Sequence, residues 1–133
     1  MNDLIFNGGN TGFQIGNQQF TIRKIAFNNE VTTVSQLQSW GRLYQGLQIN
    51  NCRRGIDIIA NGRTDWKAGS VVVIDSTITK TSVGIITAFD SVSSQSAAGS
   101  LILENIVLDD VATAVQQAGG GLFGKTGSTA IAG

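Results

Sequence analysis

The sequence contains no histidine, no proline and only one cysteine, Cys52. Without histidine the chain lacks the commonest metal ligand and the usual general base, so Ser-His-Asp and Cys-His catalysis within it are excluded. A single cysteine also excludes an internal disulfide and a cysteine-based zinc cluster. We therefore expect no metal site and no cofactor.

Charge is scarce and balanced. Nine Lys and Arg residues match nine Asp and Glu residues, and charged residues make up 14% of the chain, against a usual share of about 25%. A neutral chain offers no basic surface to attract nucleic acid or an anionic membrane. No apolar run is long enough to span a bilayer, and the N-terminal residues lack the features of a signal peptide. We expect neither nucleic acid nor membrane as a partner.

What the sequence does contain is an internal repeat. Apolar anchor positions recur at intervals of 21, 22, 29 and 30 residues, and a small residue follows each anchor six positions later. The anchors are Phe6, Phe27, Ile49, Ile78 and Leu108, and the small residues are Gly12, Thr33, Gly55, Gly84 and Ala114. An apolar residue follows each small residue directly, and further apolar residues precede the anchors. Arg42 interrupts one of these otherwise apolar columns.

Each repeat reads as three short strands, because apolar residues lie two apart and no helical spacing is sustained. The leucine-rich repeat signature is absent, and a β-sandwich gives no reason for the same corner residues to return at the same offset. We predict an all-β fold, a right-handed single-stranded parallel β-helix (a solenoid) of about five coils. Its coils span residues 1–118, and residues 119–133 form a glycine-rich loop and a final partial strand of the same domain.

Asparagine follows several anchors: Asn7-Gly8-Gly9 stands in "FNGGNTGFQI" at residues 6–15, and the pairs Asn28-Asn29 and Asn50-Asn51 occupy the same place in later repeats. Asparagine tolerates left-handed backbone geometry and hydrogen-bonds to nearby backbone groups, so stacked structural corners are the favoured interpretation. A polar surface for sugar is the alternative. Gly12 is expected to turn a further corner.

The growth in repeat length falls at one corner, between the third strand of one repeat and the first strand of the next. Its segments are "GNQQ" (16–19), "LQSWG" (37–41), "ANGRTDWKAG" (60–69) and "AFDSVSSQSAAG" (88–99). Loops stacked on one side of a repeat protein often form its binding face, and aromatic rings beside amides and carboxylates suit sugars. The candidate carbohydrate-binding residues are Gln18, Gln19, Trp40, Trp66 and Phe89. Alternatively, the two tryptophans simply cover the open side of the fold.

Several segments together resemble the first β-helix domain of fungal glycoside hydrolase family 55, the exo-β-1,3-glucanases of the wider pectate-lyase-like group. They are "FNGGNTGFQIGNQQFTIRKIAFNN", "QGLQINNCRRGIDI", "GSVVVIDSTITKTSVGIITAFDS" and "GSLILENIVLDDVATAV". This resemblance implies secretion, and hence an extracellular location, with laminarin-type substrates and inverting hydrolysis between two tandem β-helix domains. The position of "GNQQF" in that family implies a sugar or water contact for Gln18 and Gln19.

The resemblance also places the catalytic acid on a second domain, so we expect no hydrolysis by this chain alone. Inversion requires two carboxyl groups about 6.5 to 9.5 Å apart. No residue is assigned as catalytic, and Asp65 and Asp90 are the carboxylates that remain candidates. Adjacent strand residues point to opposite faces, so Asp109-Asp110 is expected to be a solvated corner.

Two other patterns favour structural interpretations. Arg53-Arg54 with Asp57 lacks the carboxylate cluster of a calcium-dependent lyase and is expected to be an exposed corner. The stretch from Gly119 to Thr126 fits a phosphate-loop pattern, but the residues after it cannot form the helix that such a loop opens.

A solenoid also exposes strand edges at its ends, and no cap is evident. The alternative function is therefore a structural, shortened or engineered scaffold that self-associates, as a homo-oligomer or with a companion domain.

Overall fold

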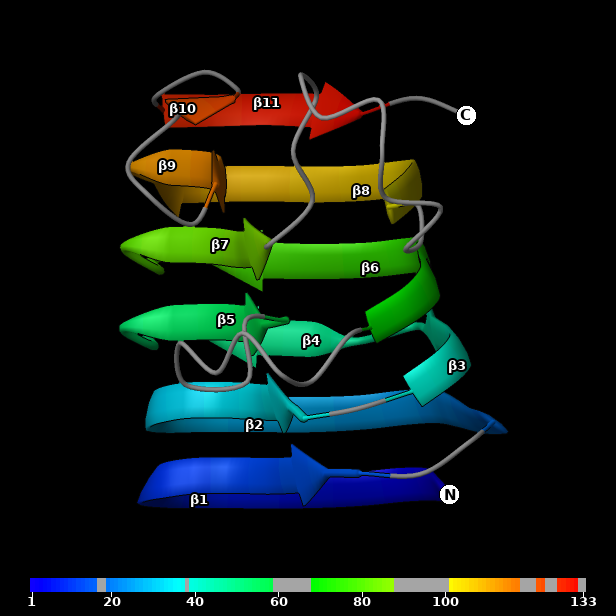
Figure 1. Ribbon diagram of the computed structural model, residues 1–133. Helices are drawn as coiled ribbons and strands as arrows, with labels where there is room; N and C mark the ends of the chain where they lie inside the picture. Colours follow the sequence, from blue (N-terminus) through cyan, green and yellow to red (C-terminus); the bar gives the residue numbers. More distant parts are fainter. Residues whose placement is uncertain are drawn as a thin grey trace.

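The computed structural model describes residues 1–16, 19–37, 39–58, 68–87, 101–117, 122–123 and 127–131. Strands account for nearly all of these residues (Figure 1). They are β1 (Asn2–Ile15), β2 (Gln19–Gln36), β3 (Ser39–Gln45), β4 (Gln48–Asn50), β5 (Arg54–Asp57), β6 (Ala68–Thr79), β7 (Val83–Thr87), β8 (Leu101–Val111), β9 (Thr113–Gln117), β10 (Leu122–Phe123) and β11 (Gly127–Ile131). None of the described residues forms a helix of the length and apolarity needed to cross a membrane.

Every pairing among β1 to β9 that the structure describes is parallel. The long strands β1 and β2 stack on one another, and β2 then pairs with β3, β4 and β5 in turn along its length. The same succession continues upward through β6 to β9 (Figure 1). The chain is thus all-β with a parallel sheet, which is consistent with the predicted parallel β-helix.

The register of these strands reproduces the columns of the repeat. Phe6 pairs with Phe27, Phe27 with Ile49, Ile49 with Ile78, and Ile78 with Leu108. Because side chains alternate between the two faces of a strand, a shift of one residue would turn every apolar side chain outward. The apolar period therefore specifies the register, and the column alignment is confirmed.

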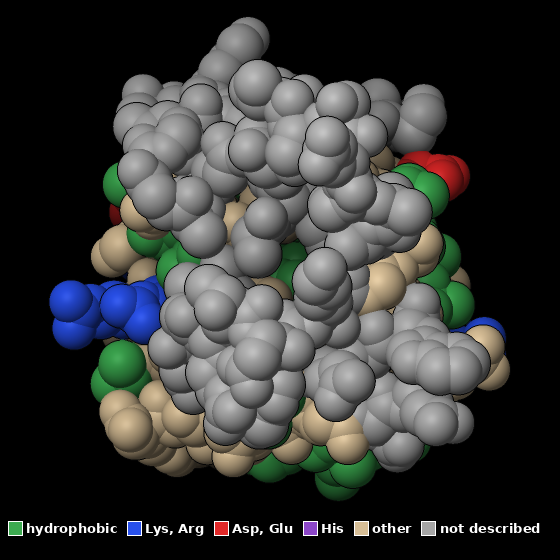
Figure 2. All heavy atoms as spheres, in the orientation of Figure 1, with side chains coloured by type: hydrophobic (Ala, Val, Ile, Leu, Met, Phe, Trp, Pro, Cys, Tyr) green, Lys and Arg blue, Asp and Glu red, His purple; other side chains and the backbone are tan. Residues whose placement is uncertain are grey.

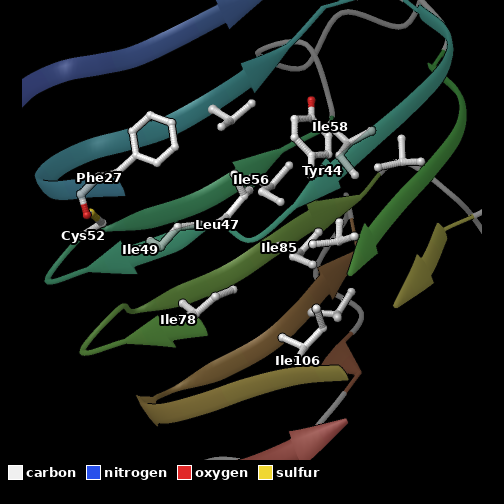
Figure 3. Close-up of a cluster of buried hydrophobic side chains, with 14 of the residues drawn as sticks. Phe27, Tyr44, Leu47, Ile49, Cys52, Ile56, Ile58, Ile78, Ile85 and Ile106 are labelled. Atoms are coloured by element: carbon white, nitrogen blue, oxygen red, sulfur yellow. The ribbon is translucent and has the colours of Figure 1, made fainter. Parts of the chain in front are cut away.

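The core consists of the inward-facing side chains of successive repeats, stacked like on like (Figure 3). Phe27, Val34, Ile49 and Ile56 are fully buried, and the Phe27 ring stacks on Phe6 with a centroid distance of 5.2 Å. Cys52 is a free, buried cysteine that packs in the same cluster, as the sequence suggested. Burial raises the pKa of the Cys52 thiol, which favours its neutral form.

The small-residue column has a different cause from the one predicted at Gly12. Gly12, Gly55 and Gly84 do not adopt left-handed φ, and they lie inside strands rather than at a turn. A Cβ at Gly84 would lie 2.7 Å from the carbonyl oxygen of Ala114, and a Cβ at Gly55 would collide with the carbonyl oxygen of Gly84. Close approach of successive backbones, and not turn geometry, therefore excludes larger side chains here.

Left-handed residues mark two stacked corners. One stack contains Asp3, Lys24, Gly46, Asp75 and Asn105, and the other contains Gly8, Asn29, Asn51, Lys80 and Asp110. Both follow the repeat spacing. A left-handed conformation costs other residues more than Gly, Asn or Asp, which explains the asparagine, aspartate and glycine at most of these positions. Asp110 lies in a corner, and both Asp109 and Asp110 are exposed, as expected for a solvated corner.

Asparagine side chains also bond from one repeat to the next. The Asn28 amide donates to Asn7 Oδ1 at 2.9 Å, and the Asn50 amide donates to Asn28 Oδ1 at 2.9 Å. A second bond runs from the Asn51 amide to Asn29 Oδ1 at 2.7 Å. These bonds support the structural interpretation of the asparagine pairs.

Replacing Asn28 with alanine removes both bonds of the first asparagine stack at once. We expect the free energy of unfolding to fall by about 1 to 2 kcal/mol, measured by urea denaturation. Asn10→Ala is the matched control, because Asn10 is an exposed residue of β1 outside the stack, and it should change stability by less than about 0.5 kcal/mol. Equal effects of the two substitutions would contradict a stabilising asparagine stack.

The C-terminal end departs from the expected open edge. Strand β11 contains the predicted final strand, but it runs antiparallel to β8, with Ile131 opposite Ile106 and Gly127 opposite Val111. Strand β10 likewise pairs antiparallel with β9. Residues 127–131 form a strand and not the helix that a phosphate loop requires. The chain therefore covers much of its own last parallel strands, so the expectation of an uncapped edge at this end is wrong.

Candidate carbohydrate-binding corner

The candidate site is the corner at which the long insertions begin and end, called here the loop corner. Its incoming strands end in register, because Ile15 pairs with Gln36, Ser35 with Asp57, Asp57 with Ile86, and Thr87 with Gln117. Its outgoing strands also begin in register, because Gln19 pairs with Gly41, Ser39 with Ala68, and Val71 with Leu101. The segments between these ends therefore start and finish on one side of the molecule, as the repeat spacing predicts.

The predicted binding residues are only partly within the described ranges. Gln19 is the first residue of β2, and its side chain is exposed at the loop corner. Trp40 lies in β3, one residue before the Gly41 that pairs with Gln19. The structure therefore brings the backbones of Gln19 and Trp40 together. Gln18, Trp66, Phe89, Asp65 and Asp90 lie outside the described residues.

A buried polar group lines the inner side of the loop corner. The Tyr44 hydroxyl donates to Gln36 Oε1 at 2.8 Å, and both side chains are fully buried. Arg42 is also buried, and its guanidinium lies 5.9 Å from the centroid of the Phe20 ring. Such a separation permits a cation–π interaction.

Burial sets the protonation behaviour of this group. It raises the pKa of Tyr44, and the nearby positive charge of Arg42 opposes that shift only in part. It also lowers the pKa of Arg42, which remains a cation at neutral pH. The inner side of the corner therefore combines one fixed positive charge with a neutral phenol.

The outer side of the corner carries a carboxylate that the sequence placed on an exposed turn. Asp57 Oδ2 lies 3.8 Å from a guanidinium nitrogen of Arg54, but Asp57 is only 1% exposed. The predicted exposed corner is thus right for Arg53 and wrong for Asp57, because Asp57 lies in β5 next to the buried Ser35 of β2. Within the described ranges, no group of three His, Cys, Asp or Glu side chains is placed to hold a metal ion.

Sequence reasoning recognised Arg42 as an interruption of an apolar column but not its role beside Tyr44 and Phe20. The useful signal was its parity, because a residue two positions before the inward-facing Tyr44 must also face inward. The described part of the loop corner thus combines a buried polar group with the exposed side chain of Gln19.

A parallel all-β fold of stacked repeats with an enlarged corner is consistent with a pectate-lyase-like protein. Comparisons with known proteins support this class. Residues 1–57 match the family model described as rhamnogalacturonase A/epimerase, pectate lyase-like. This match covers the first two repeats and part of the third.

Two of the similar proteins are fungal glucan 1,3-beta-glucosidases. The chain is 40% identical over 106 residues to a probable glucan endo-1,3-beta-glucosidase of Arthroderma benhamiae, covering 80% of this chain and 12% of that protein. It is 40% identical over 116 residues to a glucan 1,3-beta-glucosidase of Cochliobolus carbonum, covering 86% of this chain and 15% of that protein. The predicted resemblance to part of a fungal glycoside hydrolase family 55 domain is therefore confirmed.

A relative with a different name matches the same region. The chain is 33% identical over 134 residues to the non-secreted LysM effector LysM15 of Penicillium expansum, covering 92% of this chain and 9% of that protein. The chain thus spans less than a sixth of the length of each of these three relatives.

Proposed function

We propose that the chain is a β-1,3-glucan-recognising part of a glycoside hydrolase-like protein, folded as a right-handed parallel β-helix of about five coils. Residues 1–118 form the coils, and residues 119–133 complete the same domain. The observation that carries the proposal is the loop corner, where the described strands that flank the insertions end and begin in register, in a chain 40% identical to two glucan 1,3-beta-glucosidases. An extracellular location is part of this proposal, by the resemblance to these glucosidases.

Gln19 and Trp40 supply the first contacts in this proposal, with Gln18, Trp66 and Phe89 contributing from the insertions. Aromatic faces stack on sugar rings, and planar amides bond to pairs of hydroxyl groups. Gln19 is suited to this role because its side chain is exposed at the base of the corner, whereas Gln36 is buried.

Binding without hydrolysis is the second part of the proposal. The described carboxylate at the loop corner is Asp57, which is buried and paired with Arg54, so it is unsuited to act as an exposed acid or base. The remaining candidates there, Asp65 and Asp90, are proposed to be non-catalytic. Incubation with laminarin should release no glucose, and sustained release that Asp65→Asn or Asp90→Asn abolishes would contradict this part.

Titration with laminarin oligosaccharides, followed by tryptophan fluorescence, tests the binding. Trp40 and Trp66 are the only tryptophans in the chain, so a saturable fluorescence change reports directly on the proposed corner. We expect Trp40→Ala to weaken binding at least tenfold and Gln19→Ala to weaken it about fivefold, the loss of roughly one hydrogen bond.

Gln48→Ala is the matched control, because Gln48 is also exposed but lies in β4, away from the loop corner. It should leave the affinity unchanged. Absence of binding at millimolar sugar would overturn the proposed function, and weakening by Gln48→Ala alone would overturn the proposed location.

Self-association is the second candidate function, favoured by the outer edge of β1. Strand β1 pairs with β2, and no other described strand pairs with β1. The mass of the 133-residue chain in solution tests this candidate, because a strict monomer at high protein concentration would contradict it.

A further inference from the structure

The outer edge of β1 has the features of an interaction surface. The strand spans 14 residues and contains a single charged residue, Asp3, whereas exposed edge strands are usually protected by charges, proline or bulges. Six large apolar residues are exposed in the described part of the chain, and three of them lie in β1 or directly before it: Met1, Leu4 and Ile5. Hydrophobic atoms gather along the bottom of Figure 2, where Figure 1 places β1.

The last parallel strands at the opposite end of the molecule do not offer the same surface. Strand β11 already pairs with β8 from Ile106 to Val111, and β10 pairs with β9. Head-to-tail stacking, in which β1 of one copy extends β8 of the next, would have to displace β11. A closed pairing of β1 with β1 requires no displacement, and two-fold dimers are the commonest symmetric assembly.

We propose that two copies of this chain pair antiparallel through their β1 strands, with the two-fold axis passing at Ile5. This inference rests on the second candidate function and gives it a geometry. Residues opposite one another then have numbers that sum to ten, so Leu4 faces the partner's Phe6 and Ile5 faces the partner's Ile5. Inward-facing residues meet inward-facing residues, which joins the two apolar cores.

The polar residues on this edge are complementary in the same register. Asp3 lies opposite the partner's Asn7. Asn7 Oδ1 accepts from the Asn28 side-chain amide, which leaves the Asn7 side-chain amide hydrogens directed to no described partner within the chain. The molecule already uses this pairing in the corner stack that contains Asp3, where the Asn105 amide donates to Asp75 Oδ1 at 2.8 Å. A hydrogen bond to a carboxylate is about twice as strong as one between neutral groups, and symmetry supplies it twice.

No other register with the same facing of side chains gives this match. A two-fold axis at Leu4 would place Asp3 opposite the partner's Ile5. An axis at Phe6 would place Asn7 opposite the partner's Ile5. Either register leaves the carboxylate or the amide facing an apolar side chain, which is unfavourable in a desolvated interface.

Cysteine cross-linking tests the two-fold axis. Ile5→Cys should form a covalent dimer under mild oxidation, because the two β-carbons at a two-fold axis lie close enough for a disulfide. Val107→Cys is the matched control, since Val107 is exposed in the same outward column at the other end of the molecule and should remain monomeric on a denaturing gel. Cys52 is buried in both variants.

Charge exchange tests the polar contact. Asn7→Asp preserves the oxygen that accepts from Asn28 but sets two carboxylates against each other, so the dimer should dissociate at least tenfold more readily. Asp3→Asn alone should weaken the dimer only a few-fold, because its neutral amide oxygen still accepts from Asn7, and it should restore the dimer when combined with Asn7→Asp. Asparagine also tolerates the left-handed φ of Asp3.

The outcomes separate the proposals. A monomer at all concentrations overturns self-association and this geometry together, while laminarin binding is judged independently. An oligomer that persists in Asn7→Asp and gives no Ile5→Cys cross-link overturns the β1 pairing alone. Rescue by the double variant supports the specific contact, because a merely structural defect would not be repaired.

Discussion

Gly55→Ala should lower the free energy of unfolding by about 3 kcal/mol, because the added methyl group meets a backbone atom and not a movable side chain. A Cβ at this position would collide with the carbonyl oxygen of Gly84 in the next repeat. That carbonyl belongs to β7, which stacks on β5, so the two repeats would have to separate to make room for the methyl group. Relative to a total stability of about 5 to 15 kcal/mol for a domain, this is a severe loss.

Gly41→Ala is the control for this prediction. Gly41 lies in β3, and a Cβ there would have no neighbour within 4 Å. Urea unfolding should therefore give a stability within about 0.5 kcal/mol of the parent, or slightly higher because alanine restricts the unfolded chain. If Gly55→Ala proved as harmless as Gly41→Ala, the close stacking of repeats would be contradicted.

Tyr44 should fail to ionise in the folded protein as the pH is raised through its ordinary pKa of 10.0. Burial raises the pKa of the phenol in the folded state, so above pH 10 the unfolded chain loses a proton that the folded chain retains. Stability contributed by the neutral phenol is complete below pH 10. It then falls by about 1.4 kcal/mol for each further pH unit, until the pH reaches the folded pKa.

The chain makes this measurement simple because Tyr44 is its only tyrosine. Phenolate absorbance should appear together with unfolding rather than before it. Tyr44→Phe should remove this part of the alkaline loss, while costing about 1 kcal/mol at neutral pH through the lost bond to Gln36. Phenolate formation near pH 10 in a chain that still shows native circular dichroism would contradict the buried hydrogen-bonded phenol.

The repeat columns predicted the register of the strands because side-chain alternation and corner chemistry are both local properties of the sequence. Phe27 against Ile49 and Asn28 against Asn50 follow directly from matching residue types at matching offsets. The same reasoning failed at Gly12, because periodicity gives the direction of a side chain but not the distance to the next backbone.

The direction of β11, the burial of Asp57 and the buried polar group could not be predicted, because they depend on contacts between residues far apart in the sequence. Nothing local in residues 127–131 distinguishes a parallel strand from an antiparallel one, so the reversal of β11 onto β8 was not predictable. The burial of Asp57 likewise depends on what packs around β5 and not on its neighbours in sequence. At the loop corner, the sequence predicted where the insertions gather, whereas the buried group of Gln36, Arg42 and Tyr44 emerged only from the fold.

Linkage-specific binding tests the central claim most directly. The 133-residue chain should bind a β-1,3-linked glucose hexamer saturably, as measured by calorimetry, and a β-1,4-linked hexamer of the same length should neither bind nor compete. That result requires a site shaped for the curved β-1,3 chain, as the loop corner and the glucan 1,3-beta-glucosidase relatives lead us to expect. Equal binding of the two hexamers, or binding of neither at millimolar concentration, would contradict the account.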